Sequence, residues 1–409
     1  MRWTGLGGVL LGAGLLWPTS APALEIGPES NLCAALRAVP PGEELLLRPG
    51  EYEGACKIRR GGTREAPLVI RAADPQQKPR IVYHGQSANV LEVRASYVRI
   101  DGLLFGPTQS GVDAIRVFGG TGITVENCEF SGLGGIAVVS NHESVTGLSV
   151  LRNVITDSHA TGMYFGCHEG VKCRVTDLRV EGNFIRKVQA PDPEVGYGLQ
   201  VKLNSTGVIR DNVIVDTKGP GIMVYGSRDG LTVSVVERNF VMGSRESSGI
   251  VLGGGPVIAR NNIAAANSEG GITLQDYGHR DLLRGVIVAH NTLYKNREAG
   301  IELPREGRLQ DAIIVNNAAQ GRSDNPVLPK ERPGLRLAGN VDCTWAPCFV
   351  NPDGLDFSAI LGSLLSAPGS MRSEPWAPAD DYFGQARGML PVPGAVEHRG
   401  GSIRLAPKP

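Results

Sequence analysis

The sequence predicts an all-β protein that folds as a single right-handed parallel β-helix, and three observations lead to this solenoid. First, an Asn followed by apolar residues recurs eight times at intervals of 23 to 30 residues. Second, a Gly followed by the pattern apolar–any–apolar recurs seven times between the Asn residues. Third, the segments between them are short, rich in β-branched residues and without helical periodicity, which is typical of β-helix coils.

The repeated residues divide the middle of the chain into coils. The Asn series is Asn127, Asn153, Asn183, Asn212, Asn239, Asn262, Asn291 and Asn317. The Gly series is Gly135, Gly162, Gly198, Gly221, Gly249, Gly271 and Gly300. Asn at one corner of successive coils forms hydrogen bonds from coil to coil and tolerates the left-handed conformation that such corners need. We therefore expect the Asn series to be stacked at one corner and structural rather than catalytic.

The chain is expected to form one domain, because a solenoid grows in one dimension and escapes the usual size limit of a single core. Residues 1–23 are predicted to be a signal peptide, and residues 24–100 an N-terminal cap with the first coils. Residues 101–319 hold the regular repeats, and the Pro-rich residues 320–409 form a loop-rich C-terminal cap and tail. A short amphipathic helix over residues 31–37 is expected to cover the open first coil.

The N-terminus has the features of an export signal. Arg2 precedes an apolar run from Leu6 to Trp17, and Ala21 and Ala23 supply the small residues that signal cleavage requires. The run is too short to span a bilayer comfortably, and no later stretch of the sequence is long and apolar enough. We expect a secreted or periplasmic protein with no membrane insertion after cleavage.

Six of the seven Cys residues fall into three local pairs, as expected of disulfides formed in an oxidising compartment. The predicted disulfides are Cys33–Cys56, Cys167–Cys173 and Cys343–Cys348. Cys128 remains as a buried small hydrophobic residue. Cys167, Cys173 and His168 match no common zinc spacing, so no metal site is predicted.

The charge balance and the motifs narrow the class of function. The 41 Lys and Arg residues equal the 41 Asp and Glu residues, and no strongly basic face for a nucleic acid is visible. The sequence has no phosphate-binding loop, dinucleotide fingerprint or Gly-x-Ser-x-Gly elbow. We therefore predict no nucleic-acid partner and no cofactor, and we expect a monomer.

The outward positions of the Gly-containing strands form a candidate groove around Lys202. Strand residues alternate between inside and outside, so the second, fourth and sixth residues after each repeat Gly point outward. Lys202 is the one Lys or Arg at these positions, and Gly166 one coil earlier leaves room for it. The polar and aromatic residues of the groove are Gln200, Asn204, Tyr164, His168, Tyr225 and Gln275. Amides, hydroxyls and aromatic rings around one base are what a sugar chain requires.

Two insertions mark the same region. Fifteen residues separate Asn183 from Gly198, compared with eight to ten in the other coils, and the longer spacing inserts residues 190–194. The preceding coil carries the loop between Cys167 and Cys173. Because function concentrates on loops that a rigid scaffold holds, we expect these two loops to form the walls of a cleft.

Two segments carry a resemblance to known enzymes. The segment from Ala34 to Ile70 is similar to the opening of chondroitinase B and the alginate lyases. Residues 197–202 and 211–218 resemble the active-site coil of mannuronan C5-epimerases. Over most of residues 30–400 the chain therefore resembles the pectate-lyase-like superfamily of right-handed parallel β-helices, and this resemblance implies uronate chemistry on a polysaccharide.

The resemblance also implies roles for single residues. The general-base His of the epimerases falls on Lys202 and their partner Arg on Arg228, and the alginate and chondroitin lyases of this fold use a Lys base. Residues 200–203 read Gln-Val-Lys-Leu where the epimerases have Asp-Pro-His-Asp, which counts against epimerisation. Val195 and Tyr197 stand where the lyases hold calcium with an acidic pair, which counts against a calcium site.

The predicted function is metal-independent β-elimination of an acidic polysaccharide, which makes the chain a polysaccharide lyase. Lys202 would remove the C5 proton of a uronate if burial or neighbouring cations lower its pKa. Arg228 would neutralise the uronate carboxylate, and Tyr225 or Tyr164 would protonate the leaving oxygen. Substrate binding is assigned to Gln200, Asn204, Tyr164, His168 and Gln275.

Three alternatives stay open. The same groove would serve a C5-epimerase. A glycoside hydrolase needs two carboxylates, for which Glu302 and Asp276 are the candidates. A non-catalytic β-helix for polysaccharide binding or export is favoured if Lys202 has no reachable partner. Because Lys202 is taken as a surface residue, Lys202→Ala is expected to change the stability by less than about 0.5 kcal/mol.

Overall fold

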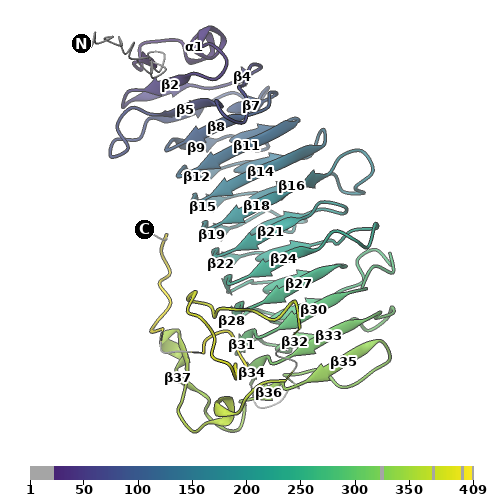
Figure 1. The fold of residues 1–409 in the computed structure, drawn as a ribbon. Coiled ribbons are helices and arrows are strands. Elements are labelled where there is room, and N and C mark those ends of the chain that lie inside the picture. The colour runs from purple at the N-terminus through teal and green to yellow at the C-terminus, as the bar shows by residue number, and fades with distance from the viewer. Residues whose placement is uncertain (1–22, 323–326, 371–373, 398–399, 408–409) are drawn as a thin grey trace, which may run out of the picture.

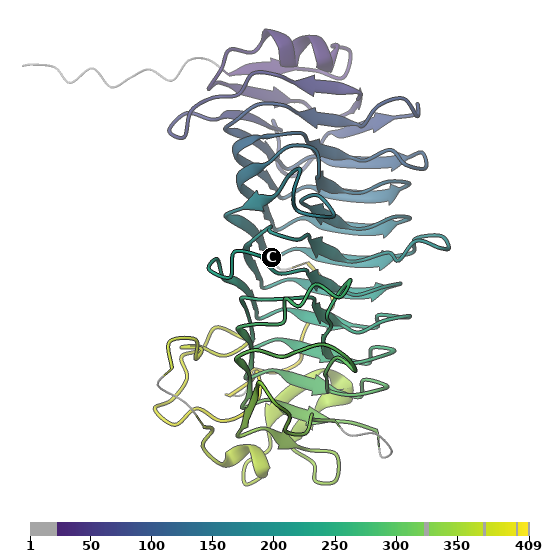
Figure 2. The same ribbon diagram turned by 90° about the vertical axis from the view of Figure 1, so that its right-hand side faces the viewer.

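The computed structural model describes residues 23–322, 327–370, 374–397 and 400–407. These residues form one elongated parallel β-helix, seen from two sides in Figures 1 and 2. Each regular coil contributes one strand to each of three parallel sheets, in the order sheet 1, sheet 2, sheet 3. The predicted fold class is confirmed. Residues 1–22, which make up nearly all of the predicted signal peptide, lie outside the described residues.

The three sheets run along the whole solenoid. Sheet 1 consists of β4 (Cys56–Ile58), β7 (Leu91–Val93), β10 (Ile115–Val117), β13 (Val138–Ser140), β16 (Met163–Phe165), β20 (Leu199–Val201), β23 (Ile222–Val224), β26 (Ile250–Leu252), β29 (Ile272–Leu274) and β32 (Ile301–Glu302). Sheet 2 consists of β1 (Leu24–Ile26), β2 (Glu44–Leu47), β5 (Leu68–Ala72), β8 (Val98–Asp101), β11 (Gly120–Glu126), β14 (Val145–Leu151), β17 (Val175–Thr176), β18 (Leu178–Glu181), β21 (Gly207–Arg210), β24 (Ser234–Glu237), β27 (Val257–Arg260), β30 (Val286–Ala289), β33 (Ala312–Val315) and β35 (Leu335–Ala338). Sheet 3 consists of β3 (Glu51–Glu53), β6 (Arg80–Tyr83), β9 (Leu104–Thr108), β12 (Glu129–Leu133), β15 (Val154–Ser158), β19 (Phe184–Val188), β22 (Val213–Thr217), β25 (Phe240–Met242), β28 (Ile263–Ala265), β31 (Thr292–Tyr294), β34 (Ala318–Gln320) and β36 (Val341–Asp342).

The core is a column of aliphatic side chains stacked in register inside the coils. In β20, Leu199 and Val201 are fully buried in this core and pair with Ile222 and Val224 of the next coil. Gln200 lies between them and points to the outside of the coil, as the alternation of strand residues requires. The sequence pattern that predicts strands therefore also fixes which residues of sheet 1 face outward.

A column of Asn side chains stabilises the corner between sheets 2 and 3. Each Asn donates a hydrogen bond to the Asn one coil later, as Asn183 Nδ2 does to Asn212 Oδ1 at 2.9 Å. Asn183 Nδ2 also donates to the Val150 carbonyl of the preceding coil at 2.9 Å. The column consists of Asn153, Asn183, Asn212, Asn239, Asn262, Asn291, Asn317 and Asn340. The predicted stacking is confirmed from Asn153 onward.

Asn127 does not belong to this column, contrary to the prediction. Cys128 takes the equivalent position, because its backbone N–H donates to Asn153 Oδ1 at 3.0 Å. Asn127 adopts a φ of +51°, and its side chain binds Asp101 and Arg152 instead. Spacing alone does not separate two neighbouring positions, since a shift of one residue leaves the repeat length nearly unchanged.

The N-terminal coil is closed by α1 (Leu32–Ala38), close to the predicted range of 31–37. Asn31 caps this helix by accepting a hydrogen bond from the Ala34 N–H at 2.8 Å. The disulfide Cys33–Cys56 ties α1 to β4. The apolar face of the helix thus covers the end of the aliphatic column that would otherwise face water.

The C-terminal end is closed by loops, short helices and a returning segment. The antiparallel pair β37 (Phe349–Asn351) and β38 (Asp356–Ala359) accompanies the 3₁₀ helices Pro352–Gly354 and Leu364–Ser366. Residues 374–397 then return along the side of the solenoid (Figure 1). The described part of the chain contains no helix that is long and apolar enough to cross a membrane.

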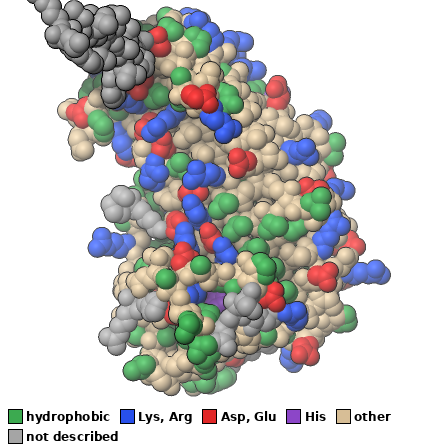
Figure 3. Space-filling model, in the orientation of Figure 1, with side chains coloured by type: hydrophobic (Ala, Val, Ile, Leu, Met, Phe, Trp, Pro, Cys, Tyr) green, Lys and Arg blue, Asp and Glu red, His purple; other side chains and the backbone are tan. Residues whose placement is uncertain are grey.

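The outer face of sheet 2 carries a ladder of ion pairs near the ends of its strands. Arg99 pairs with Glu126 at 2.5 Å, and Glu126 also pairs with Arg152. Further along, Arg210 pairs with Glu181 at 3.2 Å. Basic and acidic side chains gather in a column on this face in Figure 3. These charges neutralise one another, so this strip is structural.

Candidate functional site

Lys202 lies in the turn that follows β20, where its backbone is fixed on both sides. Its N–H donates to the Phe165 carbonyl at 2.8 Å, and its carbonyl accepts from the Ser205 N–H at 2.9 Å. Gly166, one coil earlier, has a φ of +93°, and a Cβ there would lie 2.1 Å from Ser205 Oγ and 3.2 Å from Lys202 Cβ. Only Gly therefore leaves space for the Lys202 side chain, as the sequence suggested.

A cage of tyrosine rings surrounds the Lys202 ammonium group. The Nζ donates to the Tyr225 hydroxyl at 3.0 Å and lies 4.2 Å from the centroid of the same ring. The Tyr164 and Tyr197 centroids are 4.9 Å and 6.0 Å away. Tyr225 is buried, and Lys202 itself is 4% exposed. The cation is thus held against aromatic faces that stabilise it, with little access to water.

His168 and Tyr277 complete the cage on its outer side. His168 Nδ1 lies 3.4 Å from Lys202 Nζ. Tyr277 packs edge-on against Tyr225, with ring centroids 4.7 Å apart, and against His168 at 6.1 Å. His168 comes from the loop closed by the Cys167–Cys173 disulfide, whereas Tyr277 comes from residues 275–285, which follow β29.

Residues 275–285, here named the cover loop, reach back over the cage from three coils further along. Arg280 Nη2 forms hydrogen bonds of 3.0 and 3.1 Å with both carboxylate oxygens of Glu169, next to His168. Leu282 packs in a small apolar cluster with Tyr225 and other residues of the cage region. Arg284 Nη2 donates to the Arg228 carbonyl at 2.6 Å. These contacts close the cover loop over Lys202.

Burial and charge shift the pKa values of the caged groups. Burial, followed by the nearby Arg280 guanidinium, lowers the pKa of Lys202 to about 8. Burial raises the pKa of Tyr225 well above its usual range and raises that of Tyr164 to about 12. Burial, with the Lys202 charge, lowers the pKa of His168. At neutral pH the tyrosines are therefore protonated, and Lys202 loses its proton far more readily than an ordinary lysine.

The structure brings most of the sequence-predicted residues around Lys202, but in different roles. Asn204 is engaged by the protein, because its Nδ2 donates to the Gly170 carbonyl at 3.1 Å and its Oδ1 accepts from the Arg228 N–H at 2.9 Å. Gln200 is buried beside the cage, and its Oε1 has no hydrogen-bond partner. Gln275 is exposed at the start of the cover loop.

Arg228 has a different environment from the one that the resemblance implies. Its backbone lies next to Asn204, but its side chain is exposed and forms no hydrogen bond or ion pair within the described residues. The cation that acts on Lys202 is Arg280, whose side chain is 11% exposed and whose Nη1 has no hydrogen-bond partner among the described residues. Lys202 also differs from the expected surface residue, because the cover loop buries it.

Sequence reasoning missed Arg280, and it placed Tyr277 at an outward position without assigning it a role, although a signal for their loop exists. The spacing from a repeat Gly to the next repeat Asn is 20 residues from Gly271 to Asn291. This is second to the 21 residues from Gly162 to Asn183, which hold the Cys167–Cys173 loop, and the other spacings are 13 to 18 residues. The interval from Asn to Gly, which revealed the insertion at residues 190–194, spans sheet 3 and its connection to sheet 1. It does not change when residues are inserted between sheets 1 and 2. The coil that supplies the loop is also three coils away from Lys202.

The predicted disulfides are all present, as Cys33–Cys56, Cys167–Cys173 and Cys343–Cys348, and Cys128 is buried with a free thiol. Across the described residues no group of three or more His, Cys, Asp or Glu side chains is placed to hold a metal ion. Asp276 is not a free carboxylate, because its Oδ1 accepts the backbone N–H groups of Arg280 and Asp281, both at 3.0 Å.

The chain belongs to the family described as right-handed β-helix region, which matches residues 81–235 and 168–326. A comparison with curated protein sequences finds no match. The evidence beyond the family therefore comes from solved structures.

Three solved structures are similar in fold. The pectate lyase Pel9A has 18% identity and a TM-score of 0.52, covering 93% of this chain and 97% of its own. A polysaccharide lyase of family PL6 from Pseudopedobacter saltans has 15% identity and a TM-score of 0.51, covering 78% and 92%. The A-module of a mannuronan C-5 epimerase from Azotobacter vinelandii has 12% identity and a TM-score of 0.54, covering 75% and 94%. At these identities the similarity shows the fold alone.

Proposed function

We propose that the chain is a carbohydrate-active enzyme that cleaves a uronic-acid polysaccharide by metal-independent β-elimination, with Lys202 as the base. One observation carries the proposal: Lys202 Nζ is withdrawn from water among tyrosine rings and beside Arg280, so that its pKa falls to about 8. A lysine of this kind is partly uncharged at mildly alkaline pH and can accept a proton. The similar folds of two polysaccharide lyases and a mannuronan epimerase support this chemistry.

Arg280 takes the role that the sequence assigned to Arg228, the neutralisation of the uronate carboxylate. Its guanidinium already holds one carboxylate, that of Glu169, through both oxygens, and its Nη1 is buried without a partner. A uronate carboxylate would displace Glu169 and engage the same fork of N–H groups. Neutralising that carboxylate makes the neighbouring C5 proton acidic enough to remove.

The elimination then uses Lys202 and Tyr225 as a connected pair. The uncharged amine of Lys202 takes the C5 proton, the electrons of the C5–H bond form the C4–C5 double bond, and the bond from C4 to the glycosidic oxygen breaks. Tyr225 gives its phenolic proton to the leaving oxygen. The Lys202 ammonium returns its proton to Tyr225 across the 3.0 Å hydrogen bond, so both groups are restored.

A polymer reaches Lys202 only when the cover loop is displaced, because the side chain is 4% exposed in the closed arrangement. The Arg280–Glu169 pair, with Glu169 59% exposed, is one of the contacts that hold the loop. Glu169 is open to solvent although Arg280 is nearly buried, so a substrate carboxylate that forms the same bidentate contact with Arg280 would replace Glu169 at small cost. Binding of the substrate carboxylate to Arg280 would therefore also release the Arg280–Glu169 contact that helps to hold the cover loop closed.

A glycoside hydrolase is the second candidate function, and a separate acidic pocket supports it. Glu269 accepts from Ser248 at 3.4 Å, Ser248 and Thr273 hydroxyls are 2.7 Å apart, and Thr273 donates to Glu302 at 3.1 Å. Burial, with the charges of Glu302 and Glu298, raises the pKa of Glu269. A carboxyl with a raised pKa near a second carboxyl is the arrangement that glycosidases use. Glu269 replaces Asp276 in this alternative.

The location proposed for the enzyme is outside the cytoplasm. Three disulfides in one chain are typical of the periplasm or of secreted proteins. An acidic polysaccharide substrate would be met in the same compartment, and the mature chain is proposed to act there without inserting into a membrane.

The test is a panel of polygalacturonate, mannuronan, guluronan, chondroitin and hyaluronan. Ultraviolet absorbance of the unsaturated product reports elimination, proton NMR reports inversion at C5, and a reducing-sugar assay without that absorbance reports hydrolysis. Elimination that disappears in Lys202→Ala supports the lyase, and inversion without cleavage supports the C5-epimerase. Binding without any turnover points to a non-catalytic polysaccharide-binding or export protein.

A further inference from the structure

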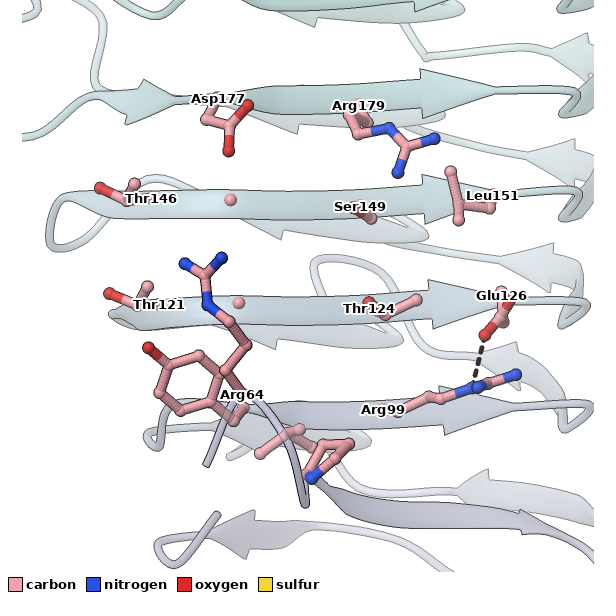
Figure 4. Close-up of a pocket in the computed structure, with 15 residues that line it drawn as sticks. Arg64, Arg99, Thr121, Thr124, Glu126, Thr146, Ser149, Leu151, Asp177 and Arg179 are labelled. Atoms are coloured by element: carbon pink, nitrogen blue, oxygen red, sulfur yellow. Dashed lines mark ion pairs between the residues drawn. The ribbon is translucent and has the colours of Figure 1, made fainter. Parts of the chain in front are cut away.

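A groove on the outer face of sheet 2 lies apart from the Lys202 cage. It crosses β8, β11, β14 and the start of β18, and its volume is about 470 Å³. Figure 4 shows its main side chains: Arg64 enters from the loop before β5, and Asp177 lies two strands beyond the strand that the Arg64 guanidinium overlies. This size lies within the range of about 300–1,000 Å³ typical of ligand sites.

Several polar groups of the groove lack partners within the described residues. Arg64 and Asp177 point toward one another across the strand that carries Thr146 (Figure 4), yet neither forms a hydrogen bond or ion pair within the described residues. The hydroxyls of Thr121, Thr124 and Ser149 are likewise unpartnered among those residues. Two further arginines that line the groove, Arg99 and Arg179, are already paired with Glu126 and Glu181. The groove is thus the part of this face whose donors and acceptors remain available.

The floor and one wall of the groove are formed by glycines and an aromatic ring. Gly122 and Gly147 are neighbours on β11 and β14, with φ of +64° and +70°. The Tyr97 ring lies directly against Gly122, since a Cβ there would be 2.7 Å from Tyr97 Cδ1. A Cβ on Gly147 would meet no atom closer than 3.6 Å, so the floor is open. A flat ligand can therefore approach the backbone beside the half-buried Tyr97 ring.

We propose that this groove is a second carbohydrate-binding site, which takes a segment of an oligosaccharide that carries a carboxylate. The Arg64 guanidinium would bind the carboxylate, and the Thr and Ser hydroxyls with Asp177 would bind sugar hydroxyls. The Tyr97 ring would lie along the apolar face of one sugar ring. Because Arg99 and Arg179 are paired with carboxylates, the groove offers one unpaired cation opposite one unpaired anion among the described residues. This arrangement does not suit a polyphosphate or a nucleic acid, and so many hydroxyls do not suit an apolar ligand.

The groove lies close to the Lys202 coil along the solenoid. Leu178, which follows Asp177, donates its backbone N–H to the Thr206 carbonyl at 3.2 Å, and Thr206 is four residues after Lys202. The groove opens on sheet 2, whereas the Lys202 side chain leaves the end of a sheet 1 strand. A site around the corner from the cage would hold the polymer without taking part in the chemistry, so its binding is independent of turnover.

The experiment is a thiol footprint in the full chain. Ser149→Cys places the single accessible thiol in the groove, because the native free thiol of Cys128 is buried. Its alkylation by iodoacetamide is timed with and without hexasaccharides of galacturonate, mannuronate, guluronate, chondroitin and hyaluronan. At ten times the dissociation constant, one of these should slow alkylation about tenfold, and maltohexaose should have little effect. Thr124→Cys is the second reporter if the first variant does not fold.

Matched variants test whether the protection comes from a hexasaccharide bound in the groove. Arg64→Ala should abolish the protection, whereas Arg37→Ala, an exposed arginine on α1 without a side-chain partner in the described chain, should preserve it. Ser131→Cys, exposed on sheet 3, should show no protection. Protection that persists in Lys202→Ala separates this site from the proposed lyase chemistry. The proposal is overturned if no hexasaccharide protects either reporter, or if Arg64→Ala leaves the protection unchanged.

Discussion

The covered Lys202 cage and the open groove on sheet 2 lie on different coils that share one repeating three-stranded plan. These coils differ in the connections between sheets 1 and 2. Two residues join β10 to β11 and four join β13 to β14, beside the groove. Eleven residues, the cover loop, join β29 to β30 and reach back over Lys202. The short connections leave the hydroxyls of the groove open to solvent, whereas the cover loop buries the Lys202 ammonium group. The contrast agrees with our proposals, which place the chemistry and a second binding site in separate parts of one scaffold.

The largest expected effect comes from Lys202→Ala. Turnover of the uronate polymer should fall by about two to four orders of magnitude, the usual contribution of a general base. Initial rates from ultraviolet absorbance give the loss, and circular dichroism with thermal unfolding checks the fold. The estimate for surface substitutions does not apply, because Lys202 is buried. Unchanged turnover in a folded variant would discard the lyase and epimerase together and favour the Glu269/Glu302 hydrolase.

Arg280→Gln is expected to have the next largest effect. Loss of the group that neutralises the substrate charge should lower kcat/KM about 100-fold. The pH midpoint of activity should also rise, because Arg280 helps to hold the pKa of Lys202 down. Arg228→Gln is the matched control and should change kcat/KM by less than about threefold, as expected of an exposed side chain without partners. A larger loss in the control would return Arg228 to the mechanism.

The pH dependence should report the Lys202 environment. Below the Lys202 pKa of about 8, kcat/KM should rise about tenfold per pH unit and then level off. Because the folded pKa is lower than the unfolded value of about 10.4, the unfolded state binds more protons between these values. Stability should therefore rise with pH in that window, by up to about 3 kcal/mol. Urea unfolding at several pH values measures this rise, which Lys202→Met should lack.

Glu169→Gln should have the smallest effect and sharpens the account of the cover loop. Freeing Arg280 from its carboxylate should lower KM about two- to fivefold, in line with the strength of an exposed ion pair. The activity midpoint should move to lower pH, because Glu169 raises the pKa of Lys202. Glu143→Gln, at another exposed glutamate, is the control. An unchanged KM in Glu169→Gln would mean that Arg280 does not receive the substrate carboxylate.

The fold was accessible from the sequence because its signals are local and repeated. The Gly and Asn spacings predict the coils, the outward alternation predicts that Lys202 leaves the coil, and Gly166 predicts the room beside it. Asn127 shows the limit, since its neighbour Cys128 occupies the stacked position and only the three-dimensional register reveals this.

The candidate site was accessible only in part, because its outer half comes from distant coils. Tyr164, His168 and Tyr225 lie within one coil of Lys202 and follow from the register. Arg280 is 78 residues away in sequence, and its position depends on the path of a loop rather than on a repeat. The burial of Lys202 depends on the same loop. Neither the position of Arg280 nor this burial could therefore be derived from the repeat spacing.

The returning C-terminal segment gives this solenoid a property that its repeat does not. Coils of a solenoid contact only their neighbours, so such proteins fray from their ends. Residues 374–397 bridge several coils: Asp380 pairs with Arg238 at 2.5 Å, the Ala395 N–H donates to Thr292 at 2.9 Å, and the Gly394 N–H donates to the Asn316 carbonyl at 2.8 Å. If the last coil alone detached, the contacts of residues 374–397 with the earlier coils would still have to be kept or broken. We therefore expect the final coils to open together, as one cooperative block, and this end of the solenoid to resist stepwise cleavage by proteases.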